Sequence, residues 1–155
     1  MIVRTHVAFG GNEIVFVGVT KPWDFKKRSQ AFSRRLEELC EMIFLPTDDA
    51  FFHWCGDKAY TPVALEISSE SRPLRDYPFP ARTALVVGNE GRGLPEDFMA
   101  RCPHRVLIPQ YGQAGCLNVA VSCSIALYEV SRASTNPQEL EGSKFGVRDT
   151  APAKG

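Results

Sequence analysis

Short apolar runs alternate with amphipathic segments along most of this chain, and this alternation limits the possible folds more than any other feature. The runs predicted to be strands are residues 14–19, 63–67, 83–87 and 105–108. They are continuous, without a polar residue at every second position, which is typical of strands covered on both faces. Helices that alternate with strands favour parallel pairing. We therefore expect an α/β fold with a mostly parallel sheet and helices on both faces.

The segments between these runs have helical spacing. Predicted helices are residues 29–40, a short helix through residues 50–54 capped by Asp48 or Asp49, residues 95–101, and residues 116–133. Residues 134–155 contain few apolar side chains and several Gly, Pro and charged residues, so we expect a disordered tail. The expected organisation is one domain over residues 1–133 followed by that tail.

Composition excludes several classes of protein. Eighteen basic and eighteen acidic residues give a net charge of +0, so any attraction to nucleic acid must be local. No stretch approaches the roughly 20 apolar residues of a membrane span, and the first residues lack the apolar core of a secretory leader. Five cysteines without a CxxC pair indicate reduced thiols in the cytoplasm and no metal site.

Two glycine-containing loops follow predicted strands. The first, Gly88–Leu94, has the spacing G-x-x-G-x-G, which differs from both the dinucleotide fingerprint and the P-loop. The second, residues 108–115, leads into the last helix, where Asn118 is expected in the first turn. Each loop alone could be an ordinary tight turn. Because ligands bind beyond the carboxyl ends of parallel strands, two such loops predict a shared pocket built from Gly88, Gly91, Ile108 and Leu117.

Three motifs in order resemble the SpoU (TrmH) family of SPOUT-superfamily RNA methyltransferases. VVGNEGRGL resembles motif 2, and IPQYGQAGCLNVAVSCSIALYE resembles motif 3. The beginning of the chain, IVRTHVAFG, resembles the end of motif 1 and contains Arg4. The resemblance covers Met1 to about Arg132.

The resemblance implies an α/β fold whose carboxyl-terminal helix forms a trefoil knot, and transfer of a methyl group from S-adenosyl-L-methionine to a ribose 2′-hydroxyl of tRNA or rRNA. It also implies a homodimer in which Arg4 lies near the cofactor of the other subunit. Residues implied to bind the cofactor are Val87, Gly88, Asn89, Gly91, Ile108, Gln110, Cys116 and Leu117. Gly88 is expected to leave room for the cofactor, and Val87 and Ile108 to enclose its adenine.

The implied catalytic residues are Arg4, Glu90 and Asn118. A guanidinium is a weak base, so we expect Arg4 to bind the RNA phosphate and to stabilise the developing alkoxide. Glu90 is expected to orient an arginine or the loop, and Asn118 to join the knot beside the cofactor. Outside the resemblance, Arg4 would be interpreted as a surface charge and Glu90 as an acid at a helix start.

Two departures from the family pattern bear on activity. The asparagine of motif 1 would fall six residues before Arg4, ahead of Met1, so we expect the first strand of the family to be missing from this sequence. Cys116 replaces the usual serine of motif 3, and a thiol is a weaker hydrogen-bond partner than a hydroxyl. A homologue that binds RNA or cofactor without catalysis is therefore an alternative, as is a generic nucleotide-binding α/β domain.

Local charge gives the chain one candidate RNA-binding segment. Its basic residues are Lys26, Lys27, Arg28, Arg34 and Arg35. Trp23 and Phe25 precede them, so phosphate contacts and base stacking could both arise there. The alternative is a solvated helix face on which these residues pair with nearby glutamates.

Overall fold

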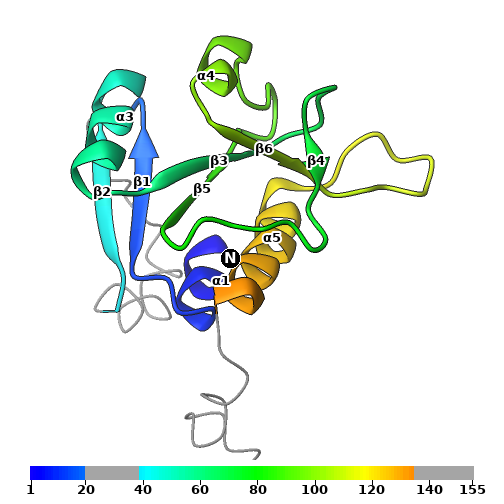
Figure 1. The fold of residues 1–155 in the computed structure, drawn as a ribbon, viewed down its shortest axis with the longest axis horizontal. Coiled ribbons are helices and arrows are strands. Elements are labelled where there is room, and N and C mark those ends of the chain that lie inside the picture. Colours follow the sequence, from blue (N-terminus) through cyan, green and yellow to red (C-terminus); the bar gives the residue numbers. More distant parts are fainter. Residues whose placement is uncertain (20–38, 135–155) are drawn as a thin grey trace, which may run out of the picture.

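The computed structural model describes residues 1–19 and 39–134 (Figure 1). All strand pairings within the described residues are parallel. One sheet pairs β1 (Glu13–Val17) with β2 (Glu41–Leu45). The other has the order β4-β6-β3-β5. Its strands are β3 (Thr61–Leu65), β4 (Arg72–Pro73), β5 (Thr83–Val87) and β6 (His104–Leu107).

The described helices are α1 (Ile2–Ala8), α3 (Asp48–Asp57), α4 (Glu96–Ala100) and α5 (Val119–Ser134). They cover both faces of the four-stranded sheet. Successive side chains of the central strand β3 point to opposite faces, so their contacts show which helix lies on which face. Ala64 packs with Phe51 of α3 and Phe98 of α4. Val63 packs on the other side with Ala126 of α5.

The two sheets share the core that α3 covers. Val15 of β1 and Leu45 of β2 pack against the cluster that contains Phe51 and Cys55. Phe16 and Phe44, which are partners in the β1–β2 register, stack with ring centroids 5.1 Å apart. One helix thus buries apolar surface from both sheets.

The first helix packs against the last one, so both ends of the described chain meet (Figure 1). The hydroxyl of Ser124 on α5 donates to that of Thr5 on α1 at 3.4 Å. Phe9, which follows α1, meets Tyr128 edge to face at 5.8 Å. No helix within residues 1–19 and 39–134 is long and apolar enough to cross a bilayer.

The α/β class, the parallel pairing and the existence of the four predicted strands are confirmed, although β1 and β3 each end two residues earlier than predicted. Several details are wrong. The cap of α3 is Thr47, whose hydroxyl accepts from the Ala50 N–H, rather than Asp48 or Asp49. The last helix begins at Val119, three residues later than predicted. The predicted helix 29–40 and the predicted tail lie almost wholly outside the described residues, although Ser134 still belongs to α5.

Candidate functional site

A cavity of about 620 Å³ opens at the carboxyl ends of β3, β5 and β6. Parallel strands place their carboxyl ends at one edge of a sheet, so the loops that follow them meet there. The cavity is lined by the ends of these strands, by the loop after β5, and by the segment that leads from β6 into α5. Its size lies within the usual range of small-molecule sites.

The loop after β5, Gly88–Leu94, folds back on itself. The side-chain oxygen of Asn89 accepts from the N–H groups of Gly91 at 3.0 Å and Arg92 at 2.9 Å. The N–H of Gly93 donates to the Asn89 carbonyl oxygen at 3.1 Å, and Gly93 has φ +64°, which favours glycine. A Cβ at Gly88 would overlap the backbone of Gly93. Gly88 is therefore required for the loop to close, and its expected role of leaving room for the cofactor stays a prediction.

Asn118 joins the two glycine loops. Its Oδ1 accepts from the N–H groups of Ala120 at 2.9 Å and Val121 at 3.4 Å, so it caps α5 rather than lying in its first turn. Its Nδ2 donates to Oε1 of Glu90 in the other loop at 2.9 Å. One side chain thus fixes the start of α5 and ties it to the loop after β5.

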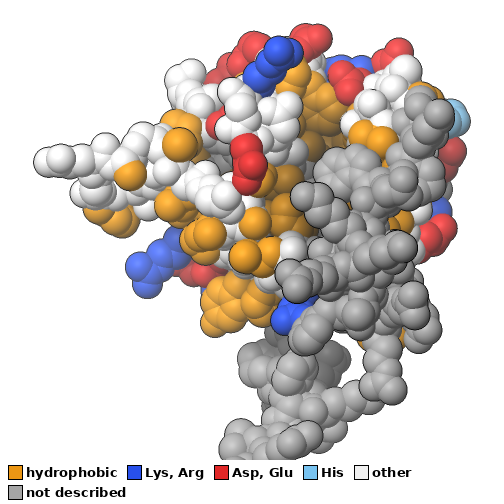
Figure 2. All heavy atoms as spheres, turned by 180° about the vertical axis from the view of Figure 1, so that it is seen from behind, with side chains coloured by type: hydrophobic (Ala, Val, Ile, Leu, Met, Phe, Trp, Pro, Cys, Tyr) orange, Lys and Arg blue, Asp and Glu red, His pale blue; other side chains and the backbone are white. Residues whose placement is uncertain are grey.

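The segment between β6 and α5 projects from the body of the molecule. It is the yellow loop in Figure 1 and the projection at the left of Figure 2, where most of its side chains carry no charge. Tyr111 near its tip is 96% exposed. Only the two ends of this segment border the cavity, through Ile108 and Gln110 at one end and residues 116–118 at the other.

The cavity combines apolar walls with a few charged groups. Leu65, Val87 and Ile108 supply aliphatic surface. Glu66, Glu90 and Arg92 also line it. Such a site suits a ligand with a flat apolar part and several polar groups, which backbone N–H and C=O groups of the two loops can orient.

The structure brings together most of the residues singled out from the sequence. All eight candidate cofactor-binding residues line this cavity, together with Glu90 and Asn118. Arg4 lies on α1 and is not among the lining residues. The basic cluster at residues 26–35 lies outside the described residues.

Sequence reasoning missed Glu66, Arg92 and Gly93, which also line the cavity. The predicted strand 63–67 placed Glu66 inside a strand, but β3 ends at Leu65 and Glu66 is the first residue beyond it. If the strand end had been predicted correctly, the sequence would have shown an acid directly after a buried strand. That position indicates a ligand-binding residue, because ligands bind beyond the carboxyl ends of parallel strands.

Comparisons with known proteins agree with one another. Residues 1–128 match the model of the SpoU rRNA Methylase family. A tRNA (guanosine(18)-2′-O)-methyltransferase of Aquifex aeolicus is 37% identical over 76 residues, which is 49% of this chain and 36% of that protein. The chain spans less than half the length of curated relatives such as this one.

Solved structures show the same fold. The TrmH/SpoU tRNA modifying enzyme of A. aeolicus superposes with a TM-score of 0.72 at 26% identity, covering 91% of this chain and 68% of that one. An AdoMet-bound rRNA methyltransferase from Sinorhizobium meliloti gives a TM-score of 0.71 at 27% identity, covering 87% of this chain and 51% of that one.

Proposed function

Because the chain belongs to the SpoU rRNA Methylase family, we propose that it transfers a methyl group from S-adenosyl-L-methionine to a ribose 2′-hydroxyl of tRNA or rRNA. The observation that carries this proposal is the hydrogen bond between Asn118 and Glu90, which joins the two glycine loops around one cavity. Similarity to RNA 2′-O-methyltransferases and to an AdoMet-bound enzyme supports the reaction and the cofactor.

The residues of the cavity fit this cofactor. A volume of about 620 Å³ accommodates a nucleoside with an amino-acid arm. Val87 and Ile108 would flank the adenine, while Gly88, Asn89, Gly91, Gln110, Cys116 and Leu117 would supply backbone and polar contacts. When bound, the cofactor supplies an electrophilic methyl group on a sulfonium.

Reaction at a ribose hydroxyl requires positioning of the oxygen and stabilisation of its developing negative charge. We assign this task to Arg4, whose guanidinium would bind the adjacent phosphate and the alkoxide. Glu90 and Asn118 would act by holding the loops in place, since their side chains bond to each other. Asn118 also caps α5, so the loop after β5 and the helix would move as one unit.

A homodimer would bring Arg4 of one copy to the cavity of another. The support is an apolar stripe on α5 formed by Val121, Ile125 and Tyr128, which are all exposed and spaced at i, i+4 and i+7. Figure 2 shows hydrophobic side chains gathered below the projecting loop, toward the end that carries α1 and α5. Closed two-fold pairing through this stripe would bury it. Sedimentation at micromolar concentration should show a dimer; a monomer would contradict this part of the proposal.

The trefoil knot, the RNA contacts and the cellular location belong to the same proposal. The tie between Asn118 and Glu90 would hold the knotted segment, and RNA would contact Lys26, Lys27, Arg28, Arg34 and Arg35. The cytoplasm suits a protein whose five cysteines are all unpaired thiols. Residues 1–133 would form the methyltransferase domain, with residues 134–155 as its tail.

The alternative is a homologue that binds RNA or cofactor without catalysis. Cys116 favours it, because this thiol lines the cavity where the family pattern has a hydroxyl. Calorimetry with S-adenosyl-L-methionine followed by methyl transfer to total RNA separates the two. We expect both binding and transfer. Binding without transfer would support the alternative, and no preference over ATP or NAD would remove both.

A further inference from the structure

Glu66 lines the cavity but has no role assigned so far, and its side chain contacts the loop after β5 directly. It is the first residue after β3, and its backbone is held on both sides. Its N–H donates to the Val106 carbonyl oxygen at 3.0 Å, and its own carbonyl oxygen accepts from the Ser71 hydroxyl at 2.8 Å. The direction of its side chain is therefore set by the sheet and by the loop after β3.

The carboxylate of Glu66 bridges two loops. Its Oε1 accepts from the N–H of Ile67 at 3.0 Å, and its Oε2 accepts from the N–H of Leu94 at 3.0 Å. Leu94 ends the glycine loop after β5, so this second bond crosses from one strand end to the next. Hydrogen bonds to a charged acceptor are about twice as strong as neutral ones.

Gly93 makes this contact possible. A Cβ at Gly93 would lie only 2.5 Å from Oε2 of Glu66. On the other side, Gly93 fills the space that a side chain at Gly88 would need. Gly93 therefore packs against both the Glu66 carboxylate and Gly88, and there is no room for a side chain at either glycine.

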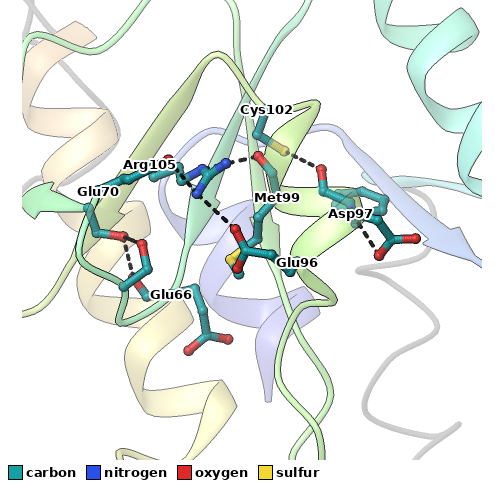
Figure 3. A network of polar contacts seen from close by, with 10 residues as sticks. Glu66, Glu70, Glu96, Asp97, Met99, Cys102 and Arg105 are labelled. Atoms are coloured by element: carbon teal, nitrogen blue, oxygen red, sulfur yellow. Dashed lines mark hydrogen bonds and ion pairs between the residues drawn. The ribbon is translucent and has the colours of Figure 1, made fainter.

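The far end of the loop after β3 is anchored separately (Figure 3). Arg105 on β6 binds Glu70 at 2.6 Å and Glu96 at 3.3 Å, and its Nε donates to the Met99 carbonyl oxygen at 3.1 Å. The side chain of Glu66 points away from this network. Glu70 thus offers a matched acid in the same loop that is not among the residues lining the cavity.

We propose that Glu66 is a positioning residue that holds the glycine loop in its cofactor-binding shape through the Leu94 N–H. A loop ordered in advance binds its ligand without losing further freedom, so the bond acts on affinity rather than on the chemical step. This deepens the proposed function and rests on it for the identity of the ligand. The positioning itself is a property of the ligand-free chain.

The test compares Glu66→Gln with Glu70→Gln in the full chain. A glutamine retains one acceptor oxygen, so it can satisfy only one of the two N–H groups. In the ligand-free protein, hydrogen exchange at the Leu94 amide should become about tenfold faster in Glu66→Gln and stay unchanged in Glu70→Gln. Because a glutamine oxygen can stay on the Leu94 N–H, Glu66→Ala, which has no side-chain acceptor, is measured beside it. Unchanged exchange at Leu94 in both variants overturns the proposal.

Binding gives a second measurement. Glu66→Gln should weaken the binding of S-adenosyl-L-methionine and of its product S-adenosylhomocysteine, which lacks the sulfonium charge, by the same factor, about tenfold. KM for the cofactor should rise accordingly while kcat changes less than about twofold. Loss of affinity for the charged cofactor alone would overturn positioning in favour of a direct charge contact.

Two further outcomes remain distinguishable. If the parent chain binds neither compound, the proposed function fails, while the exchange rate at Leu94 still decides the role of Glu66. If Glu66→Gln does not fold, Glu66→Asp replaces it, because its shorter side chain moves the carboxylate away from Leu94 without straining the Gly93 backbone, which has φ +64°. Unchanged exchange and affinity in that variant would also overturn the proposal.

Discussion

The two ends of the parallel strands carry polar clusters that differ in composition and in what they do. At the amino ends, Glu13 accepts from the Tyr60 hydroxyl at 2.6 Å and binds Lys58 at 3.0 Å. The Arg82 guanidinium lies 4.4 Å from the centre of the Tyr60 ring, and Trp54 stacks on that ring at 5.2 Å. These groups contact one another and join the two sheets.

At the carboxyl ends, the polar groups instead join loops that surround an open cavity. Asn118 and Glu66 bond to the loop after β5, and the space between the loops remains open. The difference lies in the glycines, since Gly88 and Gly93 let the first loop turn back sharply beside the strand ends. The acid, cations and aromatic rings at the amino ends thus join the two sheets, whereas the acids and the amide at the carboxyl ends surround the candidate cofactor cavity.

Arg4→Ala gives the largest expected effect and tests whether the carboxyl-end cavity suffices for catalysis. Arg4 lies outside both clusters, so cofactor affinity should stay the same. Methyl transfer should fall by roughly two to three orders of magnitude, as for loss of one preorganised donor to a developing oxyanion. Arg4→Lys should restore little, because an ammonium lacks the planar fork. Single-turnover transfer to RNA measures this, and an unchanged rate in Arg4→Ala would contradict the role assigned here.

Gly88→Val should disrupt the cavity at the carboxyl ends of the strands and leave the amino-end cluster intact. Its branched side chain would overlap the backbone of Gly93, so the loop cannot close and the cavity loses its wall. We expect cofactor affinity to fall by at least about a hundredfold, since the loop would have to refold on binding. Gly112→Val is the control, because a Cβ at Gly112 meets no atom within 4 Å. Calorimetric titration of both variants decides, and binding by Gly88→Val at the parental affinity would refute the loop-closure role.

Tyr60→Phe should affect only the amino-end cluster. Removing the hydroxyl deprives Glu13 of a hydrogen bond and should lower the free energy of unfolding by about 1–2 kcal/mol at neutral pH. Cofactor affinity should not change. Tyr111→Phe serves as the control, since that ring is almost fully exposed. A drop in affinity without a loss of stability would show that the two ends are not independent.

The same variant predicts a pH dependence. The Tyr60 hydrogen bond, followed by the charge of Lys58, lowers the pKa of Glu13 in the folded protein. An acid with a lowered folded pKa contributes stability above its unfolded pKa and loses it as the pH falls through the folded value. The stability difference between the parent and Tyr60→Phe should therefore be full at pH 6 and shrink as the pH falls below about 4. Thermal unfolding across this range measures it, and a difference that grows toward acid would have the wrong sign.

Thiol labelling gives the smallest expected effect. It compares the reaction rate of the exposed cysteine that lines the cavity with those of the buried cysteines. Burial raises the pKa of Cys55, Cys102 and Cys123 to about 11, so these thiols should react slowly at pH 8. Cys116 is exposed and lines the cavity, so it should react first. Saturating cofactor should slow that reaction a few-fold, as followed by mass spectrometry. Cys116→Ser should lack the fast reaction, and a rate indifferent to cofactor would place the ligand elsewhere.

β1, β3, β5 and β6 could be predicted because continuous apolar runs such as residues 83–87 are typical of strands in a parallel sheet. The two-residue strand β4, Arg72–Pro73, has no such pattern, since its pairing depends on β6 beside it. The helix at residues 2–8 was not predicted either. Its packing on α5 supplies contacts that no local spacing reveals.

The glycine loops predicted a pocket, but their spacing named no ligand. The cofactor and the reaction came from the resemblance of three motifs. The Asn118–Glu90 bond and the Glu66–Leu94 bond join residues 28 positions apart in each case. Such pairings depend on how strand ends meet in space, so a two-residue error in the end of β3 was enough to hide Glu66.

The strand order β4-β6-β3-β5 also governs when this cavity can exist during synthesis. β6 lies between two strands that are made earlier, so β4 has no partner in the sheet until residues 104–107 leave the ribosome. At a translation rate of roughly 5–20 residues per second, β6 emerges some 2–8 seconds after β3. During that time β4 has no strand to pair with, and β3 can pair only with β5. The cavity is lined by the end of β6, so it can be completed only after β6 has paired with β3, whose residues are distant in the sequence.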